Sequence, residues 1–66
     1  GKASLNIYDL LGRNVKTLLD EEVDGGRFSV QWRGDNNTGT IVASGVYIYR
    51  LETENSISSR SMTLIR

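Results

Sequence analysis

The chain has 66 residues, and its eight basic and eight acidic side chains cancel to a net charge of zero. A domain of this size buries only about 60% of the surface that its unfolded chain exposes, so its stability is marginal. The chain has no cysteine and no histidine, which excludes disulfides and an ordinary zinc site. We expect no cofactor. The chain has no excess of basic residues that would favour binding to nucleic acid. No apolar run approaches the roughly 20 residues that span a bilayer.

Short alternating segments separated by turn residues predict an all-β domain. The first strand is expected over residues 3–8, where Leu5 and Ile7 share one face. Asp9 and Gly12 fit the two ends of a type I turn, in which the glycine takes a left-handed conformation. The opening of the chain is therefore predicted to be a β-hairpin.

The return strand is expected over residues 13–19. The residues predicted to share one side of it are Val15, Thr17 and Leu19. A helix over residues 15–23 is the second interpretation, since several good helix formers occur there, but the β-branched residues beside a strong turn favour the strand. Residues 20–26 are predicted to form a solvated acidic loop, with a calcium site there as a weak alternative.

Residues 27–33 show the clearest strand pattern. Phe28, Val30 and Trp32 alternate with polar residues and are expected to face the core. Residues 34–40 are rich in Gly, Asn and Asp, which is typical of a turn.

The chain is expected to end in a second hairpin, with Glu54 and Asn55 as a two-residue turn. In the resulting register, position 53 faces 56, and the pairs continue as Leu51 with Ser58, Tyr49 with Arg60, and Tyr47 with Met62. One face then holds Tyr47, Tyr49, Leu51, Arg60, Met62 and Leu64. We assign this more apolar face to the core, and a slip of one residue would exchange the faces.

The opposite face of that hairpin holds four apolar residues: Val46, Ile48, Ile57 and Ile65. An uncovered patch of this kind often marks an interface. Alternatively, a further strand covers it. The sequence leaves both interpretations open.

The predicted structural core comprises Leu5, Ile7, Val15, Phe28, Val30, Trp32, Tyr47, Tyr49 and Leu51. The aromatic rings invite a second interpretation as a sugar-stacking platform, with Tyr8 the most exposed, but packing in the sheet is their common fate. Arg60 is expected to stack on the ring of Tyr49.

Three motifs have a simpler structural explanation. Residues 33–35 spell Arg-Gly-Asp, the tripeptide of integrin ligands, where a turn is expected anyway. Residues 35–39 lack the acid spacing of a calcium loop. The paired carboxylates of a glycosidase need a cleft that so small a domain hardly provides; the candidates are Glu21, Glu22, Glu52 and Glu54. We therefore expect no catalysis.

The segment LNIYDLLGRNV at residues 5–15 resembles a stretch of the type A C-terminal sorting domain of the bacterial type IX secretion system. The ordered spacing continues through Gly26 and Trp32 to GVYIYRL at residues 45–51 and ends at MTLIR, residues 62–66. Two departures are Arg33, where that family usually has an acid, and Ser61, where it usually has Lys. The aromatic and glycine spacing also resembles the immunoglobulin-like domain of flagellar hook-capping proteins, but the terminal strand favours the sorting domain.

This resemblance implies an immunoglobulin-like β-sandwich of about six or seven short antiparallel strands. Residues 1–66 would be a single domain that lacks the N-terminal strand of the family. The module would direct a cargo protein, which can itself be an enzyme, through the periplasm to the cell surface. The residues that carry the sorting signal by residue match are Gly45, Tyr47, Met62, Leu64, Ile65 and Arg66.

The implied partners are the outer-membrane secretion translocon and sortase proteins, with no nucleic acid and no insertion into the membrane. The missing strand would leave an open edge, so a homodimer through that edge is also expected. The alternative functions are a structural immunoglobulin-like module of the hook-capping type and an accessory carbohydrate-binding module of a secreted hydrolase.

Overall fold

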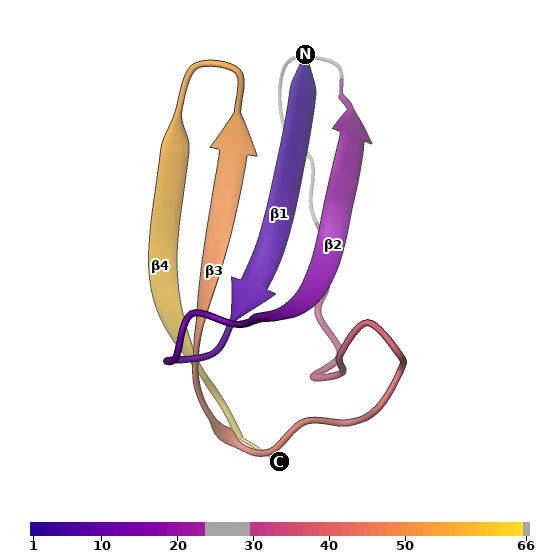
Figure 1. Ribbon diagram of the computed structural model, residues 1–66, viewed down its shortest axis with the longest axis vertical. Coiled ribbons are helices and arrows are strands. Elements are labelled where there is room, and N and C mark those ends of the chain that lie inside the picture. The colour runs from indigo at the N-terminus through magenta and orange to yellow at the C-terminus, as the bar shows by residue number, and fades with distance from the viewer. Residues whose placement is uncertain (24–29, 66) are drawn as a thin grey trace.

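The computed structural model describes residues 1–23 and 30–65. Four strands form one antiparallel sheet in the order β2-β1-β3-β4 (Figure 1). Their bounds are β1 (Lys2–Tyr8), β2 (Asn14–Glu22), β3 (Gly45–Thr53) and β4 (Ile57–Leu64). The chain thus consists of two hairpins whose first strands, β1 and β3, lie side by side. No helix in the described ranges is long and apolar enough to cross a membrane.

The all-β prediction is confirmed, but the sandwich of six or seven strands is not. The described part of the strand expected at residues 27–33 has no partner in the sheet, and the rest of it, with Phe28, lies outside the described residues. The chain bends there instead. The indole N–H of Trp32 donates to the carbonyl oxygen of Asp35 at 2.8 Å, and Gly34 between them has a φ of 74°. Beyond the four strands, the described pairing is a single bridge between Asp35 and Ile41.

The first hairpin turns where the sequence predicts. Asp9 fixes the turn, because its carboxylate accepts hydrogen bonds from the backbone N–H groups of Leu11 and Arg13 at 2.9 and 3.0 Å and from Arg13 Nε at 2.8 Å. Gly12 has a φ of 83°, which glycine adopts without steric cost. The hydrogen bond from the Arg13 backbone is the largest of the interactions that hold the pKa of the Asp9 carboxyl below its usual value.

β2 forms a strand, as preferred over a helix. It differs from the prediction in its length and in which side chains lie on each face of the sheet. It continues to Glu22, so the first acidic residues of the expected loop belong to the ladder with β1. Two irregularities interrupt that ladder and leave Leu18 and Val15 without opposite partners in β1. Such bulges reverse the facing of the residues between them. Thr17 therefore lies on the outer face, and Leu18 reaches the core.

The second hairpin has the predicted register. Thr53 N donates to Ser56 O at 2.9 Å across the turn, and Tyr47 pairs with Met62 as expected. β1 joins the two hairpins by pairing with β3, where Leu5 faces Leu51. The core face is thereby continuous across the sheet from β2 to β4.

The core is thin, and the expected core residues are buried to different degrees. Ile7 is 1% exposed and Tyr47 8% exposed, while Val30, which lines a cleft, is 38% exposed. Ala3, which the predicted core omits, is as buried as Ile7, since a small side chain fits beneath longer neighbours. The other members are half-buried: Leu5, Val15, Trp32, Tyr49 and Leu51.

Candidate functional site

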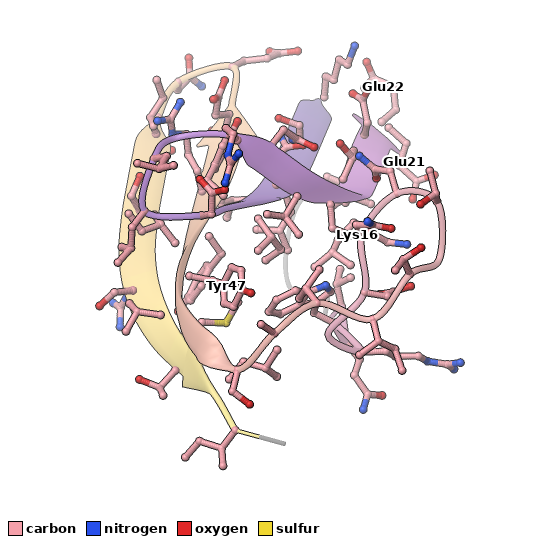
Figure 2. The ribbon with its side chains drawn as sticks, turned by 60° about the horizontal axis from the view of Figure 1, so that its bottom comes forward. Lys16, Glu21, Glu22 and Tyr47 are labelled. Atoms are coloured by element: carbon pink, nitrogen blue, oxygen red, sulfur yellow. The ribbon has the colours of Figure 1, made fainter. Side chains whose placement is uncertain are left out.

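Residues 30–44 lie against the core face of the sheet and meet it at Tyr47 (Figure 2). The rings of Trp32 and Tyr47 pack edge to face, with centroids 5.1 Å apart and planes at 71°, a favourable arrangement for two quadrupoles. The Tyr47 hydroxyl donates to the carbonyl of Ala43 at 2.7 Å. Both polar tips of the aromatic pair are therefore satisfied within the chain.

A second anchor joins this segment to β2. Lys16 points toward the loop (Figure 2), and its Nζ lies 3.2 Å from Asp35 Oδ2 and 3.3 Å from the carbonyl of Asn36. Both charged side chains are half-buried, so solvent screens this ion pair less than the surface pairs of the chain. Asp35 belongs to the Arg-Gly-Asp tripeptide, and its carboxylate is occupied by this lysine. The arrangement is that of a structural turn.

The rest of the loop is bonded to itself. Asn36 Oδ1 accepts hydrogen bonds from the backbone N–H groups of Thr38 and Thr40 at 3.1 and 2.9 Å, and from the Thr38 hydroxyl at 2.8 Å. Gly39 has a φ of 85°. In the described part of the chain, no three acidic groups converge where a metal ion could sit. The side chains that suggested a calcium loop stabilise the backbone of the loop instead.

The loop also covers the outer edge of β2. Asn37 donates its backbone N–H to the carbonyl of Val15 at 3.1 Å, and its Oδ1 accepts the backbone N–H of Thr17 at 2.9 Å. Farther along the strand, the edge carries the acidic Asp20, Glu21 and Glu22. Bulges, charge and a covering loop are three ways in which proteins protect an edge strand.

Within the described residues, the opposite edge has neither a bulge nor a covering segment. β4 pairs with β3 through eight successive residues without a bulge, and Figure 1 shows it at the margin of the sheet, with no described segment beyond it. It contains no proline, and Arg60 is its one charged residue. Its outer backbone groups are available for pairing with a further strand.

An apolar cleft of about 390 Å³ lies beside this edge, between the core face and residues 30–32. Met62, Thr63 and Leu64 of β4 line one side of it. The sheet side is formed by Leu5, Ile7, Leu18 and Tyr49. The opposite wall is formed by Val30, Gln31 and Trp32. A mainly apolar cleft next to an open edge is suited to the alternate side chains of an added strand.

The structure brings together four of the six residues that the sorting resemblance implies. Gly45 faces Leu64, and Tyr47 faces Met62, in two pairs of the same ladder. Tyr47 is buried and Met62 and Leu64 are half-buried, so they pack within the chain, whereas Ile65 is 83% exposed. Arg66 lies outside the described residues.

The aromatic rings lie on both faces of the sheet and form no shared platform in the described ranges. Tyr8 is on the outer face, where the Arg50 guanidinium lies over its ring at 5.0 Å from the centroid. This contact replaces the expected stack of Arg60 on Tyr49, because Arg50 and Tyr8 lie on the same face of neighbouring strands. Trp32 and Tyr47 are on the core face.

Sequence reasoning did not identify Lys16 and Asn37 as the residues that hold the loop to β2. Each is an ordinary polar residue in its local pattern, and each finds its partner about 20 positions away. The bulge that turns Lys16 to the core face gives no sequence signal of its own.

A single antiparallel sheet with a segment packed over one face is consistent with an immunoglobulin-like domain. The model of the FlgD Ig-like domain matches residues 1–56. The chain therefore belongs to the FlgD Ig-like domain family. This match supports the hook-capping resemblance and gives no support to the type IX sorting domain. No curated protein and no solved structure matches the chain.

Proposed function

We propose that this chain is a non-catalytic immunoglobulin-like module that acts by contact with other protein chains, as a structural part of an assembly of the hook-capping type. The observation that carries the proposal is the family match over residues 1–56. Two features of the described residues support it. The side chains of Asp35, Asn36 and Asn37 in the loop are engaged within the chain. At the opposite edge of the sheet, β4 offers an open edge next to an apolar cleft.

A domain exchange tests this function. The immunoglobulin-like domain of a flagellar hook-capping protein is replaced by residues 1–66, and hook assembly is counted in a flagellated host that lacks the native protein. We expect the chimera to assemble more hooks than the same protein with the domain deleted. A chimera that is folded and expressed, yet no better than the deletion, would overturn the proposal.

A second candidate function is the sorting of a cargo protein to the cell surface by the type IX system. One observation favours it: β4 begins at Ile57, beyond the matched residues 1–56, and contains the start of the terminal MTLIR segment. In this proposal, the translocon and a sortase are the partners, and the cargo passes through the periplasm.

The sorting proposal is tested with a reporter protein fused ahead of the chain in a type IX-competent cell. We expect export of the full fusion, and loss of export when residues 64–66 are removed. The matched control carries the conservative Leu64→Ile change, which retains the volume of the side chain. A full fusion that stays in the periplasm, or a shortened one exported at the normal level, would refute this function.

A further inference from the structure

We propose that two copies of this chain pair through their β4 strands, antiparallel about a two-fold axis at Ser61, to form one continuous sheet. The proposal concerns the chain itself and holds for either function above. Its starting point is the difference between the two edges: in the described residues, β2 is bulged, acidic and covered, and β4 is regular and uncovered.

The alternation of hydrogen-bonded and non-bonded residue pairs in the second hairpin shows which backbone groups of β4 point away from β3 and can pair with another strand. Thr53 N donates to Ser56 O at 2.9 Å, so these two residues form a bonded pair. Bonded and non-bonded pairs alternate along an antiparallel ladder. Counting from this pair, the residues of β4 whose backbone groups point away from β3 are Ile57, Ser59, Ser61 and Thr63.

A second β4 strand can pair with these groups only in certain registers. A two-fold axis at Ser61 sets the residues whose backbone groups point away from β3 opposite residues of the same kind in the other copy. Ser59, for example, faces Thr63 of the other copy. An axis at Arg60 also satisfies the backbone, but it sets two arginines directly opposite each other on one face, which is unfavourable. The axis at Ser61 places Arg60 opposite Met62 instead. It also aligns nearly the full length of the strand, from Ile57 to the residue after Leu64.

Two exposed isoleucines fit this register. Ile57 begins β4 and Ile65 directly follows its last residue, and the two side chains are 68% and 83% exposed. They are too far apart to cover each other within one copy. About the axis at Ser61, Ile57 of each copy faces Ile65 of the other, on the same face of the joined sheet. Pairing of β4 with itself therefore covers both side chains at once, which identifies a second copy as the partner.

The assembly stops at two copies. After the β4 strands pair, the free edges of the joined sheet are the two β2 strands. The acidic ends of two β2 strands repel each other, and the bulges and the Asn37 contacts of β2 block regular pairing. Among the described strands, β4 is the one unprotected edge, so an isologous contact through it closes into a dimer. The chain carries no net charge, so copies do not repel one another over longer distances.

Cysteine cross-linking tests the register, and the lack of native cysteine leaves single-cysteine variants free of background reactions. Ser61→Cys would place two thiols on directly opposite residues, about 5.5 Å apart at Cα, within the range for a disulfide. Ser59→Cys is the matched control, on the same edge and face. Its two copies would be offset by four residues, roughly 13 Å along the strand.

We expect Ser61→Cys to form covalent dimers under mild oxidation about tenfold faster than Ser59→Cys. A mixture of Ser59→Cys and Thr63→Cys chains should give the mixed dimer. Equal rates for the two single variants, or preferred linkage through Arg60→Cys, would overturn the register.

Sedimentation equilibrium tests the dimer itself. The unmodified chain should show a concentration-dependent shift from monomer to dimer and no larger species. Ser61→Pro removes one outward N–H without touching the bonds to β3, and should be monomeric with unchanged circular dichroism, while Ser61→Ala should dimerise normally. A chain that stays monomeric at all concentrations, or Ser61→Pro chains that dimerise as the unmodified chain does, would refute the proposal.

Discussion

The two edges of the sheet have similar lengths and opposite designs. β2 has two bulges, an acidic end and a loop bonded to its backbone through Asn37. β4 has a regular ladder, a serine-rich sequence and no described neighbour on its outer side. Since unprotected edges promote association, the protection of one edge and not the other is the basis of our proposal that this module makes its contacts through β4.

The largest effect is expected from loosening the segment that covers β2. Trp32→Ala removes the ring that packs on Tyr47 and the N–H that holds Asp35. Because Trp32 is half-buried, we expect a loss of about 3 kcal/mol in the free energy of unfolding, near the low end for such truncations. Urea unfolding measures it. Trp32→Phe retains the ring and should lose less, and an unchanged midpoint for Trp32→Ala would show that the segment does not depend on this contact.

A charge on the open edge is expected to act on association and leave folding unchanged. Ser61→Lys would place two like charges directly opposite each other in the proposed dimer, which we expect to weaken it about tenfold, or about 1.4 kcal/mol. Sedimentation equilibrium measures the dissociation constant. Ser59→Lys adds the same charge to the same edge, away from its symmetry mate, and should have the smaller effect. The order would reverse if the axis lay at Ser59.

Removing the Asn37 contact tests whether the loop protects the backbone of β2 at the edge of the sheet. Asn37→Ala removes the acceptor of the Thr17 N–H, which should cost about 1 kcal/mol in unfolding free energy. The Thr17 amide should then exchange its hydrogen faster than in the unmodified chain. Asn37→Asp keeps an acceptor oxygen at the same place and serves as the control. If both variants exchange alike, this contact does not protect the edge.

The smallest effect is expected at the turn that leads into β2. The pKa of Asp9 is lowered in the folded chain, so its contribution to stability is fully present above the unfolded pKa of about 3.9 and is lost as the pH falls through the lower folded value. Asp9→Asn should therefore destabilise the chain at neutral pH and match it more closely in strong acid. Thermal unfolding at both pH values measures the difference, and a difference that does not depend on pH would exclude the carboxylate as its source.

Local patterns were sufficient for much of the fold. The Glu54-Asn55 turn fixed the register of the second hairpin, because a two-residue turn leaves one way to pair the strands. Asp9 and Gly12 likewise marked the first turn. The alternation of Val30 and Trp32 predicted a strand over residues 27–33, and its described part does not pair in the sheet, because a period of two predicts an extended segment and does not provide a partner for it.

The apolar alternation of β1, β3 and β4 and the turn residues between them determined by themselves an all-β chain with two hairpins. The tertiary structure decided how the hairpins join, where β2 bulges, and that Lys16 and Asn37 hold the loop to it. These contacts connect residues about 20 positions apart, so their formation depends on the packed geometry of the whole sheet. The contrast between the edges is also a tertiary property, because the position of each strand in the sheet decides which strands lie at its edges.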